Sequence, residues 1–280
     1  MPANHMAVFA DVHPTPGVAK PDPILVADNV RRSFGGLNAV SVDHLEIQRG
    51  AITALIGPNG AGKTTLFNLL TGFDEADEGT WTFQEKPVNR LSPHRLAQIG
   101  MVRTFQLTKA LSRMSVLDNV KLGARKQLGE RIYLAPFSFA WRRQERENTE
   151  RAMELLDRFN LKDKAVDFAG SLSGGQRKLL EMARALMTDP DLIMLDEPMA
   201  GVNPALTQSL LQHIKSIRDE GKTVFFVEHD MDMVHDISQW VVVMAEGQII
   251  AEGLPDVVMR DTRVIDAYLG AHHDEDFEEA

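Results

Sequence analysis

A glycine-rich loop between a buried strand and a helix constrains this chain more than any other feature. Residues 51–56 (AITALI) form a continuous apolar run, GPNGAGKTT follows at 57–65, and a helical run covers 66–70. Glycines let the backbone curl so that successive N–H groups point at phosphate oxygens, and the start of a helix adds partial positive charge. The pattern predicts a site for ATP or GTP in a largely parallel α/β sheet.

The side chains of this loop have separate expected tasks. Lys63 reaches the β- and γ-phosphates, and the Thr64 hydroxyl takes a position on magnesium. The alternative, a glycine turn that merely starts a helix, fits the strand, loop and helix context poorly. The expected nucleotide contacts are Asn59, Gly60, Ala61, Gly62, Lys63, Thr64 and Thr65.

Two adjacent carboxylates end a second buried strand. The apolar run at 192–195 (LIML) leads into Asp196 and Glu197. Ligands of such sheets gather at the carboxyl ends of the strands. We therefore expect Asp196 to hold magnesium and Glu197 to orient and polarise the water that attacks the γ-phosphate. The alternative is that two acids simply end a strand, in which case the chain would hold nucleotide without hydrolysing it.

Composition excludes several classes of protein. The 280 residues carry 30 Lys and Arg against 40 Asp and Glu, for a formal net charge of −10, and the basic residues form no block longer than a pair. This balance argues against nucleic-acid binding. The absence of cysteine excludes disulfides, thiolate zinc sites and cysteine nucleophiles. Because every apolar run is far shorter than the roughly 20 residues of a membrane helix, and nothing near Met1 resembles a signal peptide, we expect a soluble chain.

The remaining pattern predicts one α/β unit with an inserted helical part. Alternating runs at 24–31, 41–47 and 81–86 predict antiparallel strands, whereas continuous apolar runs at 51–56, 191–195, 224–227 and 240–244 predict strands buried on both faces. The expected divisions are an unstructured, proline-rich lead at 1–22, an α/β core at about 23–106 and 181–253, a helical part at about 107–180, a C-terminal helix at about 254–269 and a solvated acidic tail at 272–280.

A second helix start carries the motif that points to a family. In LSGGQ at 172–176, Ser173 and Gln176 fit a capping box, and the exposed N–H groups of a helix start form an anion site. With the phosphate loop upstream and Asp196 about 20 residues downstream, the sequence resembles the ATP-binding cassette (ABC) family. The resemblance spans about residues 23–270. It implies an ABC-type nucleotide-binding domain with a P-loop RecA-like core, an antiparallel β subdomain and an inserted helical subdomain.

The resemblance implies further site residues. Gln106 matches the glutamine that contacts magnesium and the surroundings of the attacking water, and His229 matches the histidine that touches the γ-phosphate. Phe34, with Val40 nearby, matches the aromatic loop that stacks on adenine. Taken alone, these residues also fit an ordinary surface, strand-end or core position. The implied catalytic residues are Lys63, Gln106, Glu197 and His229, the magnesium ligands are Thr64, Gln106 and Asp196, and the residues that bind a partner cassette's nucleotide are Ser173, Gly174, Gly175 and Gln176.

One position departs from the family pattern. Where the family usually has an aspartate in the loop that crosses the dimer, this chain has Asn203 followed by Pro204. An asparagine N-cap with proline at the first helical position is an ordinary helix start. An amide can form a hydrogen bond across an interface but carries no charge, so the substitution puts in doubt how tightly two sites communicate.

Short stretches narrow the resemblance to the ATP-binding subunit of branched-chain amino acid importers. They are RSFGGL at 32–37, RTFQ at 103–106, AGVNP at 200–204, VEHDM at 227–231 and VIDAYLG at 264–270. The stretch 128–148 also lengthens the helical part, as in that subunit. Its four aromatic residues either face a membrane partner or pack against their own lobe, and we favour the second: Tyr133, Phe137, Phe139 and Trp141.

The resemblance also implies cofactors and partners. ATP and Mg²⁺ are the expected cofactors, and a second cassette, identical or different, is the expected dimer partner. Two transmembrane permease subunits and, indirectly, an extracytoplasmic solute-binding protein complete the implied system, which places the chain at the cytoplasmic face of the inner membrane and involves no nucleic acid. Two alternatives stay open: the same motor with another cargo, such as urea, short amides or exported lipopolysaccharide, and a soluble ABC ATPase acting on DNA or ribosomes.

Overall fold

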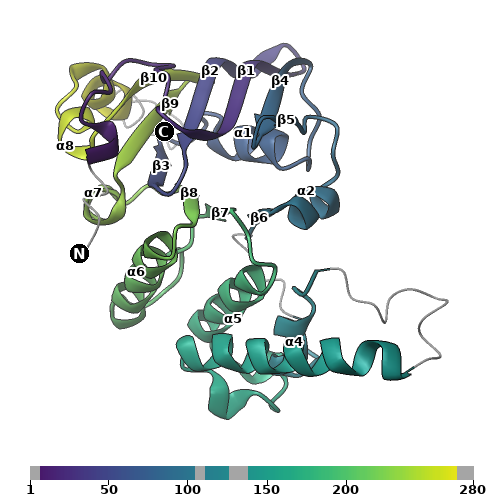
Figure 1. The fold of residues 1–280 in the computed structure, drawn as a ribbon. Coiled ribbons are helices and arrows are strands. Elements are labelled where there is room, and N and C mark those ends of the chain that lie inside the picture. Colours follow the sequence, from purple (N-terminus) through teal and green to yellow (C-terminus); the bar gives the residue numbers. More distant parts are fainter. Residues whose placement is uncertain (1–6, 105–110, 126–137, 270–280) are drawn as a thin grey trace.

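The computed structural model describes residues 7–104, 111–125 and 138–269 (Figure 1). As drawn, two sheets lie above and a group of helices lies below. In the six-stranded sheet the order is β10-β9-β3-β8-β7-β6, and β10 is antiparallel to its neighbour while the others are parallel. The strands are β3 (Ile52–Ile56), β6 (Met101–Arg103), β7 (Leu192–Asp196), β8 (Thr223–Val227), β9 (Trp240–Ala245) and β10 (Gln248–Gly253).

Every residue of β3, β7 and β8 is buried, as their apolar runs predict. Successive residues of a strand face opposite sides of the sheet, and β3 divides its side chains between two apolar clusters. Ile52, Ala54 and Ile56 belong to one cluster, and Leu55 belongs to the other. The phosphate loop therefore follows a strand that is fixed from both sides.

The second sheet is antiparallel, which confirms the prediction from the alternating runs. Its order is β2-β1-β4-β5. The strands are β1 (Pro23–Phe34), β2 (Leu37–Gln48), β4 (Glu78–Phe83) and β5 (Lys86–Pro87). Helix α1 (Lys63–Leu70) shares an apolar cluster with strands of both sheets, because its buried Phe67 packs in the same core as Val42 of β2 and Phe225 of β8.

The lower group of helices contains the predicted helical part (Figure 1). One apolar cluster joins it to the six-stranded sheet, since Phe159 and Leu180 belong to the same cluster as Ile193 of β7. The described helices are α2 (Pro93–Ile99), α3 (Val116–Lys121), α4 (Ser138–Arg158), α5 (Gly174–Met187), α6 (Pro204–Asp219), α7 (Met231–Ile237) and α8 (Pro255–Val258), and the 3-10 turns are η1 (Ala7–Phe9), η3 (Lys162–Lys164) and η4 (Ala169–Ser171).

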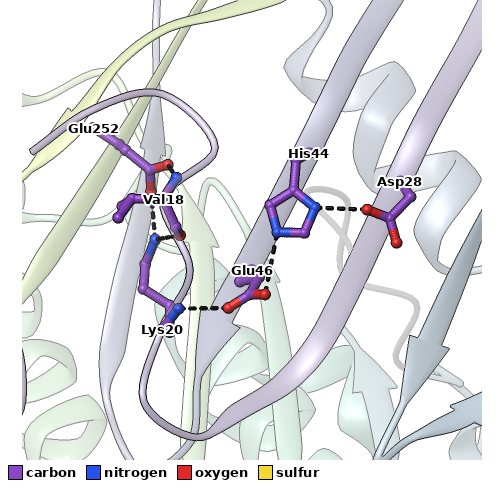
Figure 2. A network of polar contacts seen from close by, with 6 residues as sticks. All are labelled: Val18, Lys20, Asp28, His44, Glu46 and Glu252. Carbon is purple, nitrogen blue, oxygen red and sulfur yellow. Dashed lines mark hydrogen bonds and ion pairs between the residues drawn. The ribbon is translucent and has the colours of Figure 1, made fainter.

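The prediction of an unstructured lead at 1–22 is wrong for residues 7–22. Phe9 is buried and stacks on Trp240, with 4.7 Å between ring centroids. Lys20 Nζ forms an ion pair with Glu252 Oε2 at 2.8 Å, and the side chains are only 1% and 0% exposed. The Lys20 backbone N–H donates to Glu46 of β2 (Figure 2). The segment is ordered because its few apolar and charged side chains meet partners far away in the sequence.

The predicted single C-terminal helix at 254–269 is also wrong, because the chain forms two shorter helices there. Helix α8 ends at Val258, and a second helical segment covers 262–269. Asp261 lies between them, and its Oδ1 accepts a hydrogen bond from the Arg263 N–H at 2.9 Å. A side chain that caps a helix in this way starts a new helix rather than continuing the previous one.

Some predictions fall outside the described residues. These are Gln106, the acidic tail at 272–280, and the side chains of Tyr133, Phe137, Phe139 and Trp141. Within 7–104, 111–125 and 138–269, no helix is both long enough and apolar enough to cross a bilayer.

Candidate functional site

The phosphate loop forms one wall of a cavity of about 570 Å³. The other walls come from the beginning of β2, from Glu197 after β7, and from the turn between β9 and β10. The structure thus brings all seven predicted loop residues to one place. The lining residues are Leu37, Asn38, Ala39, Asn59, Gly60, Ala61, Gly62, Lys63, Thr64, Thr65, Glu197 and Glu246.

Two loop positions require glycine. Gly57 has φ +150° and Gly62 has φ +95°. A Cβ atom on Gly57 would lie 2.0 Å from the Met244 carbonyl oxygen, and one on Gly62 would lie 2.3 Å from the Ala39 carbonyl oxygen. The loop therefore packs its backbone directly against β9 and β2, which fixes its N–H groups in the curled form that phosphate binding needs.

Lys63 lies over its own loop. Its Nζ donates hydrogen bonds to the carbonyl oxygens of Gly57 at 2.6 Å and Pro58 at 2.8 Å. Burial lowers the pKa of Lys63, and attraction to Glu197 partly opposes that shift. The ammonium group is thus held at the phosphate end of the cavity by groups that a phosphate oxygen can replace.

Asp196 and Glu197 lie in different surroundings. Glu197 lines the cavity, and its backbone is left-handed with φ +44°. Its N–H donates to the Val227 carbonyl oxygen at 3.1 Å, which ties the turn to β8. Few non-glycine residues in proteins adopt this conformation, and those that do are concentrated at functional sites. Asp196 is buried at the end of β7 and binds Arg103 instead, with 2.6 Å between Oδ2 and Nη2.

The LSGGQ segment starts α5 with the predicted capping box. Ser173 Oγ accepts from the Gln176 N–H at 3.2 Å, and Gln176 Oε1 accepts from the Ser173 N–H at 3.0 Å. Gly174 and Gly175 form the first turn. These four residues do not line the cavity described above. Lys178 connects the helix to the turn after β7, because its Nζ donates to the carbonyl oxygens of Glu197 at 3.2 Å and Pro198 at 3.0 Å.

His229 follows β8 at the surface. Its side chain is 66% exposed, and its Nδ1 lies 3.7 Å from Oε2 of the buried Glu228. Burial raises the pKa of Glu228, although hydrogen bonds from the N–H groups of Met199 and His229 oppose that shift. The structure places His229 outside the cavity lining, so a contact with nucleotide would require this side chain to turn inward.

The residues matched to the adenine-stacking loop do not line the cavity either. Phe34 is half-exposed at the end of β1, and the Arg32 guanidinium lies 4.6 Å from its ring centroid. Val40 is fully buried in the core. The cavity is lined instead by Leu37, Asn38 and Ala39, which lie between Phe34 and Val40 in the sequence. Leu37 is apolar and 72% exposed. Leu37 therefore belongs to the cavity wall, whereas Phe34 and Val40 do not.

Sequence reasoning missed several residues of the site. Leu37, Asn38 and Ala39 follow the Gly35-Gly36 turn, and Glu246 precedes Gly247 in a two-residue hairpin turn. The glutamate-glycine pair after an apolar strand is a recognisable turn signal, but only the fold brings that turn to the phosphate loop. The Gly247 N–H donates to the Ala61 carbonyl oxygen at 3.1 Å, and its carbonyl oxygen accepts from the Ser41 N–H at 2.7 Å.

The predicted magnesium ligands fit that ion chemically. Thr64 supplies a hydroxyl oxygen in the cavity wall and Asp196 a carboxylate oxygen at the end of β7, and Mg²⁺ prefers oxygen donors. A cluster of three acidic or histidine side chains that could hold a metal unaided is absent from the described part of the chain.

Comparison with known proteins identifies the family. A family model described as "ABC transporter" matches residues 40–200. A second model, "Branched-chain amino acid ATP-binding cassette transporter", matches residues 248–274. The chain belongs to the ABC family of ATP-binding cassettes. As a member of this family it is a nucleotide-binding, ATP-hydrolysing subunit of a transporter, and the resemblance found in the sequence is confirmed.

Individual relatives of this cassette agree with the assignment. A probable branched-chain amino acid transport ATP-binding protein, LivG, from Archaeoglobus fulgidus is 40% identical over 90% of this chain and 97% of its own length. The high-affinity branched-chain amino acid transport ATP-binding protein BraF from Pseudomonas aeruginosa is 40% identical over 89% of this chain and 98% of its own length.

Solved structures resemble this cassette in the same way. An ABC transporter cassette in its ADP conformation is 38% identical, with a TM-score of 0.77 over 89% of this chain and 99% of that one. A dimeric bacterial cassette is 25% identical, with a TM-score of 0.68 over 82% of this chain and 98% of that one. These neighbours confirm the ABC-type fold.

Proposed function

We propose that this ABC ATPase energises the import of branched-chain amino acids. The observation that carries the proposal is the 40% identity, over nine-tenths of the chain, to proteins named for branched-chain amino acid transport. The match of residues 248–274 to a model for that transporter class supports it independently, since this segment lies outside the general ABC match.

We assign the chemistry of hydrolysis to the residues around the cavity. Lys63 binds the β- and γ-phosphates, and Thr64 and Asp196, with Gln106, hold Mg²⁺. Glu197 orients and polarises the attacking water, because its carboxylate lines the cavity and lies close enough to Lys63 to attract the ammonium group. Bound Mg²⁺ neutralises charge that develops on the phosphate oxygens. His229 contacts the γ-phosphate after turning inward.

We propose that nucleotide binds between two cassettes. The start of α5, Ser173 to Gln176, lies away from the chain's own cavity and offers backbone N–H groups, so it is suited to a partner's γ-phosphate. The dimeric relative supports such an arrangement. ATP then joins the two protomers, and hydrolysis weakens the contact. The α/β core at about 23–106 and 181–253 and the helical part at about 107–180 are the two bodies that we expect to move.

The proposed partners outside the dimer follow from the same relatives. Two transmembrane permease subunits respond to the closing and opening of the cassette dimer, and a solute-binding protein delivers the cargo to them. The cassette then works at the cytoplasmic face of the inner membrane. Asn203 caps α6 through a hydrogen bond from the Leu206 N–H at 2.9 Å, so its place in the structure is that of a helix cap, and any role across the dimer is additional.

Two variants test the nucleotide site. Lys63→Ala removes the main cation for the triphosphate, so we expect ATP affinity to fall at least about a hundredfold. Glu197→Gln keeps the shape but removes the base, so we expect ATP binding to persist, turnover to fall at least about a thousandfold and a dimer to accumulate in ATP. Isothermal titration, phosphate release and sedimentation measure the three quantities. Normal turnover by Glu197→Gln would show that another group activates the water.

The cargo requires a separate experiment. Purification of the tagged chain from native membranes in mild detergent should recover two different multi-span proteins and a second cassette. Reconstituted with the solute-binding protein, that complex should take up leucine, isoleucine and valine in an ATP-dependent manner, with Glu197→Gln as the inactive control. Uptake of urea or amides instead, recovery with a lipid-export permease, or recovery without any membrane partner would each overturn the amino-acid assignment.

A further inference from the structure

Arg103 connects the predicted magnesium ligand to the helix that begins at the phosphate loop. It is the last residue of β6, beside β7 in the sheet. Its Nη2 donates to Asp196 Oδ2 at 2.6 Å, while its Nη1 donates to Asn68 Oδ1 at 2.7 Å and Thr71 Oγ1 at 3.0 Å. One guanidinium therefore joins the end of β7 to the last turn of α1.

The pair is closed off from water. The side chains of Arg103 and Asp196 are 5% and 8% exposed. The guanidinium carbon also lies 5.7 Å from the ring centroid of Phe67 and 5.6 Å from that of Phe73. A guanidinium stays charged at any pH a protein tolerates, and its planar fork fixes the direction of each hydrogen bond. Asp196 is thus held in one orientation before any cation binds.

This orientation decides how Asp196 can reach a metal. Because Arg103 occupies Oδ2, a cation bound to Asp196 is held through Oδ1 or shares Oδ2 with the guanidinium. Groups that orient a metal ligand in this manner typically change metal affinity by about 10- to 100-fold when they are removed.

Arg103 also lines two hollows of about 170 Å³ each, one against Phe73 and Leu96 and the other against Leu122 and Arg184.

We propose that Arg103 is a positioning residue for the magnesium site, which holds the Asp196 carboxylate in one orientation and links it to α1 and to the two hollows that Arg103 lines. The inference rests on the proposed nucleotide site and adds to it. Arg103 acts through Asp196 and α1, and the reacting atoms are contacted by other residues.

The test compares Arg103→Met and Arg103→Lys with the control Arg184→Met, which alters the same hollow without touching Asp196. The affinity for a fluorescent ATP analogue is measured in EDTA and over a magnesium titration, and nucleotide-dependent binding of Mn²⁺ is measured by electron paramagnetic resonance. For Arg103→Met we expect the nucleotide affinity in EDTA to stay within about threefold of that of the parent. We expect the concentration of Mg²⁺ or Mn²⁺ needed for half-maximal effect, called here the cation requirement, to rise at least about tenfold. Arg103→Lys should fall between, and Arg184→Met should match the parent.

A cation requirement of Arg103→Met equal to that of the parent would overturn the proposal. If Arg103→Met does not fold, the decision passes to Arg103→Lys in the Asp196→Asn background. In that background Arg103→Lys should not raise the magnesium requirement further, because the carboxylate that Arg103 positions is already replaced. If Arg103→Lys raised the requirement in Asp196→Asn as much as it does in the parent, the inference would be contradicted. Failure of the nucleotide site itself would be distinguishable, since the parent would then bind no nucleotide in EDTA and Lys63→Ala would change nothing.

Discussion

Gly60 and Gly62 lie two positions apart in the phosphate loop, and both have positive φ, +76° and +95°. A Cβ atom at position 60 meets nothing within 4 Å, whereas at position 62 it would lie 2.3 Å from the Ala39 carbonyl oxygen. The two positions therefore separate backbone strain from steric overlap within the same loop.

We expect Gly62→Ala to weaken ATP binding far more than Gly60→Ala. Alanine in the left-handed region costs about 1–2 kcal/mol at either site, but only Gly62→Ala must also push the loop away from β2. Titration with a fluorescent ATP analogue should show a loss of up to about tenfold for Gly60→Ala, and a loss greater by at least another factor of about ten for Gly62→Ala. Equal losses would mean that the loop does not need its contact with Ala39.

His44 provides a pH-dependent contribution to stability (Figure 2). Burial by itself lowers the pKa of His44, but hydrogen bonds to Asp28 at 2.6 Å and Glu46 at 3.1 Å outweigh it and raise the pKa above its usual value. A pKa raised by folding adds stability that is fully present below the unfolded pKa, and that stability is lost as pH rises through the folded pKa.

The melting temperature of His44→Gln should therefore fall below that of the parent by more at pH 6 than at pH 8.5. Asp28→Asn serves as the matched variant, because it leaves the imidazole in place and removes its stronger partner, so it should reduce the same pH dependence. A difference between parent and His44→Gln that is independent of pH would show that the imidazole stabilises the sheet by packing alone.

At the scale of the element, the segment 7–22 contributes through the Lys20–Glu252 ion pair. Glu252 also accepts hydrogen bonds from the Val18 N–H at 3.0 Å and from Trp240 Nε1 at 2.8 Å. Burial lowers the pKa of Lys20, and attraction to Glu252 partly opposes that shift. The buried carboxylate thus depends on three donors, of which only Lys20 brings a full positive charge.

Lys20→Met should lower the free energy of unfolding by about 3–5 kcal/mol, because it leaves a buried carboxylate without its cation. Urea unfolding followed by circular dichroism measures this loss. The double variant Lys20→Met with Glu252→Gln should recover a large part of it, since the uncompensated charge is then gone. If Lys20→Met is as stable as the parent, the segment is held by Phe9 and its stacking on Trp240 rather than by charge.

The elements that sequence reasoning predicted are those with local causes. The run 51–56 and its loop carry their own apolar and glycine pattern, and Ser173 and Gln176 cap α5 with atoms three residues apart. The order of 7–22 has no local cause, because Lys20 and Glu252 are 232 residues apart. The same holds for Leu37 and Glu246, which become cavity residues only when the two sheets meet.

At the scale of the whole molecule, one apolar cluster runs from the six-stranded sheet into the helical part. Phe159 of the helical part and Ile193 of β7 belong to it together. The two bodies proposed to move against each other are therefore not independently folded, so the motion must keep most of this cluster in contact.

We expect calorimetry to show a single unfolding transition. In Glu197→Gln, which retains ATP, magnesium and ATP at about a hundred times the dissociation constant should stabilise the fold by about 2.7 kcal/mol and raise the melting temperature by roughly 5 °C. Lys63→Ala should show no such rise. Two transitions, a first whose melting temperature is unchanged by ATP and a second whose melting temperature rises with ATP, would indicate that the helical part unfolds on its own.

The hairpin of β9 and β10 has one end beside the phosphate loop and the other end under the N-terminal segment. The Gly247 N–H binds the Ala61 carbonyl oxygen at the first end, and Lys20 binds Glu252 at the second (Figure 2). Mechanical tension applied through the N-terminus would thus be delivered to a strand that braces the phosphate loop. A surface tether or a bulky fusion attached at the N-terminus would therefore apply force to the phosphate loop through this hairpin. Attachment to the exposed surface of α4 would apply no force to the hairpin.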